Sequence, residues 1–473
     1  MSLMNIAAII DRFEPLIIDA MTEQKIPGLS VAVVKDDEVI YERGFGARDC
    51  GTGAAVTPDT LFGIGSCTKS FTSLAVMQLV HDGKIDVDDP ISKYVPVTLE
   101  SGRKPISVHR LLTHSSGIPD LGIATLAIAK LLGKQSHLPA IPLASWEDFY
   151  THVNGAGREL IEPGSRFWYF NGGYIILGQI VARTSGISYE NYVKEHILKP
   201  LDMERSTFLE DEWKKDSDVS TGYDTEGHGD EFRLIPSSHL CDEFAYAGGG
   251  LLSSVRELAN YLIANMQGGN FRGKRITDSS VLQRMHQVHV YYDVRNQTGL
   301  GQFGKSGYGY GWSVSEDFFG YALVNHGGST AVSSAYLGFV PQLKTGIAAL
   351  ANTGDMPIHP MIALLAMVAG KDPQVDIPYY PRKRHVDRLT GDYETYKGIH
   401  KMSVVNRGGL LHVVSKFLGS EASYPLIAEN GSTNSLEFYV VTDLGTKRYV
   451  NFVVHGNGEV EFFAERCRFH KVQ

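Results

Sequence analysis

A serine and a lysine stand three residues apart, as Ser66 and Lys69, in the stretch GIGSCTKSFTSLAVMQLV. Apolar residues recur at helical spacing from Ser66 to His81, which predicts that both side chains lie on one face of a helix. A serine hydroxyl becomes a nucleophile when a base takes its proton, and burial or a helix N-terminus lowers the pKa of a lysine toward that role. The pair therefore predicts nucleophilic catalysis.

The bare S-x-x-K pattern also fits a serine N-cap followed by a solvated lysine, so it needs companions. It occurs again at residues 101–104, where a glycine and a following proline predict a loop, and we assign that copy no role. Two further groups accompany the first copy. Tyr169 and Asn171 stand in a loop before a predicted helix, and His326 follows the strand-like run YALVN in a His-Gly-Gly sequence.

In this order, the motifs S-x-x-K, Y-x-N and H-x-G resemble those of the serine β-lactamase-like superfamily. This superfamily includes class C β-lactamases, DD-peptidases, D-aminopeptidases and β-lactamase-fold esterases, grouped as peptidase family S12. The stretches PGLSVAVVKDDEVIYERGFG, LLTHSSGIP, AGGGLLSSVRELANYL and GIAALANTG are similar to the family as well, so the resemblance covers about residues 5–370. It implies a β-lactamase/transpeptidase-like α/β (α+β) fold, an antiparallel sheet flanked by helices, with a helical subdomain.

The resemblance also implies a role for each matching residue. Ser66 attacks a carbonyl and becomes acylated. Lys69 takes the serine proton, or shares it with Tyr169, whose phenol then passes a proton to the leaving group. Asn171 hydrogen-bonds Lys69 and the substrate amide, and the backbone amides of Ser66 and Ser329 form an oxyanion hole.

His326 stands where the β-lactamases carry a lysine, whose permanent charge can receive a substrate carboxylate. A histidine is mostly neutral at pH 7, so amide or ester hydrolysis is favoured over β-lactam turnover. We expect a serine hydrolase without metal or organic cofactor that acts on a small-molecule or peptide substrate, foremost as a carboxypeptidase or aminopeptidase, with D-residue specificity as one option. The alternatives are an esterase of this fold and a penicillin-binding module with slow or no turnover.

Other motifs suggest different chemistry. Residues 299–306, GLGQFGKS, match the phosphate-binding loop G-x-x-x-x-G-K-[ST], but neither DVRNQT before them nor GYGYGW after them fits the strand and helix that such a loop requires. A literal KTG at residues 344–346 reads as a turn into a strand. Cys67 is interpreted as an inert small residue, and His114 as a loop brace rather than a metal ligand.

Apolar periodicity predicts the elements that would position these residues. We expect helices at residues 1–24, 66–81, 108–112, 123–132, 174–184, 189–198, 255–266 and 356–369, a hairpin turning at residues 36–37, and four strands between residues 308 and 352. Three prolines within residues 372–381 predict a semi-rigid connector. Short alternating runs separated by Asn-Gly turns follow, and they predict a small all-β domain that resembles an appended lipocalin-like barrel.

We therefore expect a catalytic domain at residues 1–375 and a β-domain at 382–473, with self-association or gating through the second. The formal net charge of −9, from 44 Lys+Arg and 53 Asp+Glu, lacks the basic footprint of a nucleic-acid-binding protein, and Arg382–His385 is interpreted as a solvated charge run. The four cysteines are dispersed, no apolar run reaches about 18 residues, and the N-terminal helix carries charges. These features predict a cytoplasmic protein without membrane association.

Overall fold

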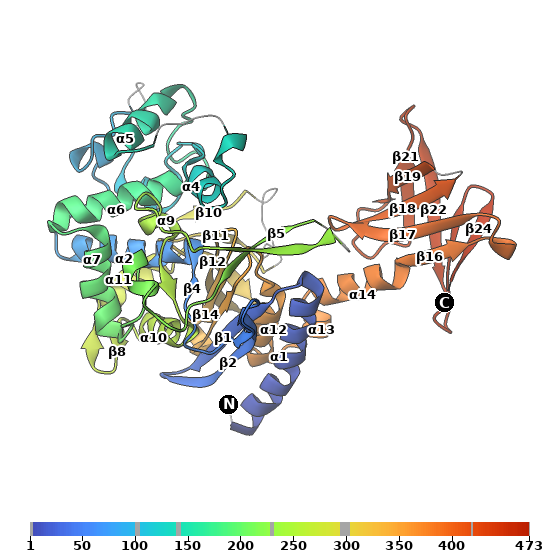
Figure 1. Ribbon diagram of the computed structural model, residues 1–473, viewed down its shortest axis with the longest axis horizontal. Coiled ribbons are helices and arrows are strands. Elements are labelled where there is room, and N and C mark those ends of the chain that lie inside the picture. The colour runs from blue at the N-terminus through green and yellow to red at the C-terminus, as the bar shows by residue number, and fades with distance from the viewer. Residues whose placement is uncertain are drawn as a thin grey trace. The chain divides into compact units, whose positions relative to one another are not determined.

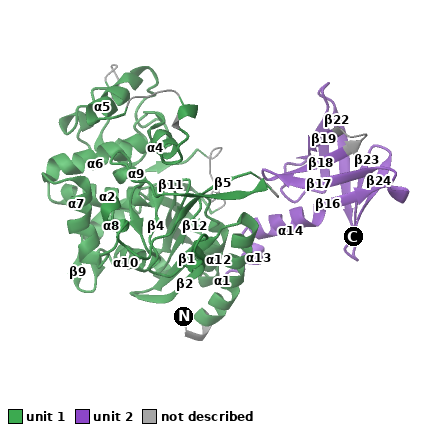
Figure 2. Ribbon diagram, in the orientation of Figure 1, with its two compact units in different colours: residues 1–370 green, residues 371–473 purple. Residues whose placement is uncertain are grey.

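The computed structural model describes residues 3–99, 105–138, 143–227, 231–293, 303–417 and 420–472. The chain divides into two compact units, Met1–Gly370 and Lys371–Gln473 (Figure 2). The second S-x-x-K copy at residues 101–104 lies outside the described residues, as does the first half of the phosphate-loop match at 299–306. Within the described ranges, no helix combines the length and apolar character that crossing a membrane requires.

The first unit is built on a nine-stranded antiparallel sheet with the order β10-β11-β12-β13-β14-β15-β1-β2-β3 (Figure 1). Its strands are β1 (Gly28–Lys35), β2 (Glu38–Asp49), β3 (Ala54–Ala55), β10 (Val290–Tyr291), β11 (Ser306–Tyr308), β12 (Ser313–Phe318), β13 (Tyr321–Ser329), β14 (Ser334–Val340) and β15 (Thr345–Ala351). The N-terminal hairpin joins the last strand in register, with Leu29 opposite Ala351. The predicted antiparallel sheet is therefore confirmed.

Helices cover this sheet and form a separate helical layer beside it (Figure 1). They are α1 (Leu3–Gln24), α2 (Thr68–His81), α3 (Val108–Leu112), α4 (Ile123–Leu131), α5 (Trp146–Gly155), α6 (Asn171–Ser185), α7 (Tyr189–Val193), α8 (Glu210–Trp213), α9 (Tyr246–Gly249), α10 (Val255–Met266), α11 (Ser279–Met285) and α12 (Ile358–Val368). Helix α10 packs on β1 and β15, while α1 packs with α12, which lies on β14 and β15. The strand β1 is buried from Gly28 to Val34, so its apolar run reads as continuous rather than alternating.

Short two-stranded pairs complete the first unit. They are β4 (Phe62–Gly63) with β7 (Leu252–Ser253), β5 (Gly222–Glu226) with β6 (Arg233–Ser237), and β8 (Asn270–Phe271) with β9 (Lys274–Arg275). The pair β4 and β7 matters most for function, because β4 leads directly into the turn that carries Ser66. Helix α2, which follows this turn, packs against α6, α9 and α11 and is buried along most of its length.

Two predicted helices differ in their details. The helix expected from Ser66 begins as an α-helix at Thr68, and Ser66 itself lies in a preceding 3-10 turn, Gly65–Cys67. The helix expected at 189–198 ends at Val193 and continues as one wider π-helical turn. The literal KTG is a turn into a strand, as predicted, because Lys344 has a left-handed φ of 45° and β15 begins at the next residue.

The second unit begins with two helices, α13 (Pro373–Asp376) and α14 (Tyr379–Leu389). The segment predicted as a semi-rigid connector is therefore largely helical rather than an extended proline-rich stretch. The prolines stand at the starts of helices, where a missing backbone N–H costs nothing because the first turn has no intrahelical partner for it. Prolines alone do not distinguish an extended segment from the first turn of a helix, because both accept them.

Nine antiparallel strands complete the second unit, in the order β19-β18-β17-β16-β24-β23-β22-β21-β20. They are β16 (Gly391–Glu394), β17 (Lys401–Arg407), β18 (Leu410–Phe417), β19 (Ser420–Pro425), β20 (Ile427–Ala428), β21 (Glu437–Val441), β22 (Lys447–Val454), β23 (Val460–Ala464) and β24 (Cys467–Lys471). The two edge strands, β19 and β20, are separated by Leu426 alone, so the two edges of the sheet must lie close together. The sheet is a nearly closed barrel, which confirms the predicted all-β domain.

The barrel is filled with apolar side chains, and α14 caps them. Leu389 of α14 is buried in the same cluster as the barrel's aromatic rings, Tyr393, Phe438, Phe452, Phe462 and Phe469. The basic run on α14 is not simply solvated, as interpreted from the sequence. Arg382 donates to the carbonyl of Gly409 at 2.7 Å, and Nε2 of His385 donates to the carbonyl of Ser435 at 2.9 Å, so the run fastens the helix to the barrel.

Candidate active site

The turn that carries Ser66 is pressed against the end of strand β13. Gly65 has a left-handed φ of 51°, and a Cβ atom there would lie 2.4 Å from the backbone nitrogen of Ser329. A Cβ atom on Gly328 would lie 2.0 Å from the carbonyl oxygen of Ile64 and 2.9 Å from the backbone nitrogen of Ser66. Only glycine fits at both positions. The two backbone amides expected to form an oxyanion hole are thus brought to one place.

Lys69 is fully buried one helical turn below Ser66. Its Nζ atom lies 3.0 Å from Oγ of Ser66, 2.9 Å from Oδ1 of Asn171 and 2.6 Å from the carbonyl oxygen of Gly248. The last two partners can only accept hydrogen bonds. A neutral amine, with two N–H groups and one lone pair, would therefore donate to Asn171 and Gly248 and direct its lone pair at the hydroxyl of Ser66.

Burial sets the protonation of this amine. It lowers the pKa of Lys69 from its usual 10.5 to about 7, against an opposing Coulombic effect from Cys67. The polar partners of Nζ are a hydroxyl, an amide and a carbonyl rather than a carboxylate, so no anion holds the proton in place. A substantial fraction of the amine is neutral near pH 7, which is the form that can accept a proton.

Tyr169 is also a neighbour of Ser66 and of Lys69. Burial raises the pKa of its phenol above the usual range, although a hydrogen bond with Ser66 partly opposes this shift. The ammonium group of Lys69 is 4.9 Å from the centroid of the tyrosine ring. The phenol therefore stays protonated at neutral pH, and it can donate or relay a proton but is a poor first base.

His114 holds the segment that presents Tyr169. Its backbone carbonyl accepts from Trp168 N–H at 2.6 Å and its Nδ1 accepts from Phe170 N–H at 3.0 Å. Its ring stacks on the ring of Tyr169, with centroids 4.0 Å apart. These contacts fit the loop-bracing interpretation, and they add a direct contact with the tyrosine that the sequence did not indicate.

His326 lies near the end of β13 and is buried. Its Nδ1–H donates to the carbonyl of Gly327 at 2.6 Å, and its Nε2 accepts from the hydroxyl of Tyr308 at 2.9 Å. Burial first, and the charge of Lys69 second, lower the pKa of the imidazole to about 4. The residue at the third motif is therefore neutral at pH 7, with both ring nitrogens engaged inside the protein.

Tyr308 is a residue of the site that sequence reasoning missed. It stands on β11, two strands from His326 on β13, and its ring packs edge-on to Tyr169 at 6.4 Å between centroids. In the sequence, Tyr308 belongs to the run GYGYGW that follows the phosphate-loop match, and nothing there marks it as a site residue. No local motif links it to His326, because the contact depends on the order of strands in the sheet.

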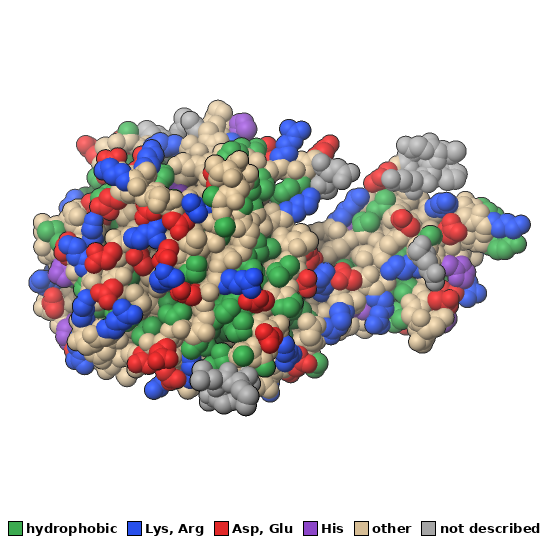
Figure 3. All heavy atoms as spheres, turned by 60° about the horizontal axis from the view of Figure 1, so that its bottom comes forward, with side chains coloured by type: hydrophobic (Ala, Val, Ile, Leu, Met, Phe, Trp, Pro, Cys, Tyr) green, Lys and Arg blue, Asp and Glu red, His purple; other side chains and the backbone are tan. Residues whose placement is uncertain are grey.

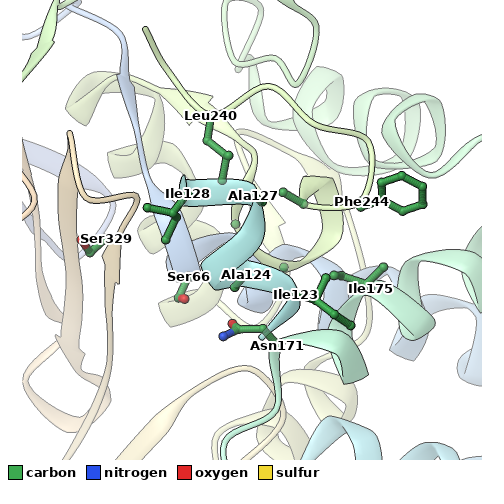
Figure 4. Close-up of a pocket in the computed structure, with 13 residues that line it drawn as sticks. Ser66, Ile123, Ala124, Ala127, Ile128, Asn171, Ile175, Leu240, Phe244 and Ser329 are labelled. Carbon is green, nitrogen blue, oxygen red and sulfur yellow. The ribbon is translucent and has the colours of Figure 1, made fainter. Parts of the chain in front are cut away.

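A cavity of about 100 Å³ opens beside Ser66. Figure 4 shows helix α4 at this cavity, with the side chains of Ser66 and Asn171 close to it and Ser329 on a neighbouring strand. Most of the wall is apolar. The lining residues are Ser66, Ile123, Ala124, Ala127, Ile128, Asn171, Ile175, Leu240, Phe244, Ala245, Gly248, Gly249 and Ser329.

The other candidate sites do not gain support. Burial raises the pKa of the Cys67 thiol to about 12, which fits the interpretation of this residue as an inert small side chain. The phosphate-loop match runs into β11, a strand, where a nucleotide site needs a helix N-terminus. Among the described residues there is no cluster of three or more histidine, cysteine, aspartate or glutamate side chains able to hold a metal ion. Figure 3 shows acidic and basic side chains interspersed on the face drawn.

Comparisons with known proteins agree with this geometry. Residues 13–369 match the family model described as Beta-lactamase, and residues 373–470 match the Pab87 octamerisation domain. A solved structure described as the octameric penicillin-binding protein homologue from Pyrococcus abyssi is 35% identical, with a TM-score of 0.87, and the alignment covers 98% of this chain and 100% of that one. A class C β-lactamase, 21% identical with a TM-score of 0.60, covers 77% of this chain and 96% of its own, and shows the shared fold.

Curated relatives are more distant in sequence. Protein flp of Staphylococcus aureus strain MW2 is 27% identical over 337 residues, which are 69% of this chain and 60% of that protein. This chain thus spans only about 60% of the length of Protein flp. Penicillin-binding protein 4 of Amycolatopsis lactamdurans is 28% identical over 82% of this chain and 97% of its own. With a family model matched from residue 13 to 369, the chain belongs to the β-lactamase family.

Proposed function

We propose that the protein hydrolyses amide or ester bonds through an acyl-enzyme on Ser66, foremost as a peptidase of the carboxypeptidase or aminopeptidase type. One observation carries this proposal. The amine of Lys69 is buried, has a pKa of about 7 and lies 3.0 Å from Oγ of Ser66, a distance at which its neutral form can take the serine proton.

In the first step, Lys69 takes the proton of Ser66 as Oγ attacks the substrate carbonyl. The new oxyanion would be held by the backbone N–H groups of Ser66 and Ser329. Tyr169 then gives its phenolic proton to the leaving group and regains one from the ammonium of Lys69. The carbonyl bond to the leaving group breaks, and the acyl group remains on Ser66. A water molecule releases it by the same proton route in reverse, with side chains and backbone amides supplying every step.

The neutral third motif bears on the kind of bond that is cleaved. A β-lactam carries a carboxylate, and the imidazole of His326, with a pKa of about 4, offers it no positive charge at pH 7. Peptidase, amidase or esterase activity is therefore favoured over efficient β-lactam hydrolysis. A penicillin-binding module that acylates slowly is the second candidate. The family membership and the similarity to penicillin-binding protein 4 favour it.

Covalent labelling and burst kinetics test the proposal together. A serine-directed fluorophosphonate should label Ser66, and both labelling and turnover should be lost in Ser66→Ala. A panel of p-nitrophenyl esters and D- and L-amino-acid amides should be turned over many times per enzyme. Release that stops after one equivalent would favour the binding module, and labelling retained at another residue would overturn the assignment of Ser66.

We also propose that the barrel mediates assembly of identical chains. Residues 373–470 match an octamerisation domain, and the homologue from Pyrococcus abyssi is described as octameric. The aromatic rings that fill the barrel argue for this role over binding of a lipid-like ligand. A cytoplasmic location also remains our proposal, supported by the four cysteines, all of which are unpaired thiols.

A further inference from the structure

We propose that the cavity beside Ser66 is an acyl pocket that selects substrates with an uncharged, apolar acyl group. This inference rests on the acyl-enzyme function proposed above and names its substrate class. The cavity has a volume of about 100 Å³ and reaches the side chain of Ser66. Polar side chains line the cavity next to Ser66, and the rest of its wall is apolar.

One face of helix α4 forms much of the apolar wall. The lining positions on this helix are Ile123, Ala124, Ala127 and Ile128, which recur at the spacing of one helical face. Ile175 of α6 and the side chains of Leu240 and Phe244 complete the wall. The polar side chains among the lining residues are Ser66, Asn171 and Ser329, and all of these lining residues are uncharged.

The wall has a rigid part. The ring of Phe244 is buried and packs against Trp146, with centroids 4.7 Å apart, and against Phe149 at 6.2 Å. This packing holds Phe244, and with it the part of the wall to which Phe244 belongs.

The position of the proton donor decides which part of the substrate enters. Tyr169, which we assign to protonate the leaving group, does not line the cavity, and neither does Lys69. The leaving group must lie beside the residue that protonates it. The cavity is lined by Ser66 and Asn171 but not by Tyr169 or Lys69, so we assign it to the part of the substrate that stays on the serine.

Physical chemistry then gives a direction for selectivity. Each methylene that moves from water into an apolar wall contributes about 0.8 kcal/mol, which corresponds to a factor of about four in binding. A carboxylate in the same place would lose its hydration without gaining a cationic partner. Substrates with aliphatic acyl chains should therefore be preferred, and anionic acyl groups of the same length should be rejected.

A series of p-nitrophenyl esters with one leaving group isolates the acyl side. From acetate to butyrate to hexanoate, kcat/KM should rise by about two- to fourfold per added methylene. For the mono-p-nitrophenyl ester of glutaric acid, kcat/KM should be at least tenfold lower than for the pentanoate ester of matching length. A flat chain-length series, or a glutarate ester as good as the pentanoate ester, would overturn the pocket.

Two variants locate the effect. Ala127→Phe fills the cavity and should lower the hexanoate-to-acetate ratio of kcat/KM at least tenfold, whereas Thr125→Phe, at an exposed position of α4 outside the lining, should leave that ratio unchanged. Ile128→Lys adds a cation to the wall and should raise the glutarate-to-pentanoate ratio, a gain that a misfolded variant cannot give. An unchanged hexanoate-to-acetate ratio in Ala127→Phe would contradict the proposal.

The outcome is distinguishable from failure of the proposed function. If no ester is hydrolysed and a fluorophosphonate does not label Ser66, the acyl-enzyme function itself is wrong. If Ser66 is labelled and esters are hydrolysed without any dependence on acyl length or charge, the function stands and the pocket alone is refuted.

Discussion

Tyr308 donates a hydrogen bond of 2.9 Å to Nε2 of His326, and this contact defines the third motif of the site. Because Nδ1–H is used by the carbonyl of Gly327, the imidazole has one tautomer and no free nitrogen. The histidine therefore shapes the end of β13 as a neutral group. The charge that is free to change near neutral pH lies on Lys69, whose pKa is about 7.

Acylation should follow the titration of Lys69. The neutral amine is the active form, so kcat/KM for a p-nitrophenyl ester should rise with pH through a midpoint near 7 and then level off. Replacement by arginine, which stays protonated throughout this range, should lower kcat/KM by at least a thousandfold. Stopped-flow measurements of acylation between pH 5 and 9 check both expectations. A midpoint near 4 would instead point to His326, whose imidazole has its pKa there.

Tyr169→Phe should affect amides far more than activated esters. The phenol, held protonated by burial, supplies the proton that an amine leaving group needs, whereas p-nitrophenolate departs without one. We expect kcat/KM to fall about 100- to 1,000-fold for an amino-acid anilide, and less than tenfold for p-nitrophenyl acetate. Steady-state kinetics on the matched pair of substrates give the ratio. Equal losses on both would assign the tyrosine to the attack of Ser66 rather than to departure of the leaving group.

Some residues of the site could be predicted because they lie close together in the sequence, and others could not because they meet only in the folded sheet. Ser66, Lys69 and Asn171 belong to short motifs, and the structure brings their side chains into direct contact. The pairing of Tyr308 with His326 depends on β12 lying between β11 and β13, which no local pattern specifies.

The same distinction applies to the fold. Apolar periodicity was enough for the helix at Val255–Met266, because burial of one face leaves a regular pattern. The strands β14 and β15 are buried throughout, so they stand out as continuous apolar runs. It was not enough for residues 372–389, where proline can mark either an extended connector or a helix start. The packing of Leu389 into the barrel core decides for the helix, and that contact is visible only in three dimensions.

Tyr308→Phe should destabilise the protein through His326. The substitution removes the donor and leaves Nε2 of the buried imidazole without a partner, at a cost of about 1–3 kcal/mol in the free energy of unfolding. Removing the imidazole as well, in the double variant with His326→Leu, should cost less than the sum of the single changes. Urea denaturation of the four proteins measures this coupling. Strict additivity would show that the hydrogen bond contributes nothing to stability.

Assembly through the barrel should depend on apolar side chains exposed on the isolated chain. Tyr396 and Ile399, in the turn between β16 and β17, are 73% and 71% exposed, and water-exposed apolar groups of this kind become favourable when a second chain covers them. The double variant Tyr396→Asp/Ile399→Asp should shift the mass in solution from an oligomer toward the 52.0 kDa monomer, measured by light scattering during size exclusion. Ile18→Asp, which places the same charge on an exposed isoleucine of the first unit, should leave the mass unchanged. A wild-type chain that is already monomeric at micromolar concentration would refute the proposed assembly, and an oligomer that survives the double variant would move its contacts to another part of the chain.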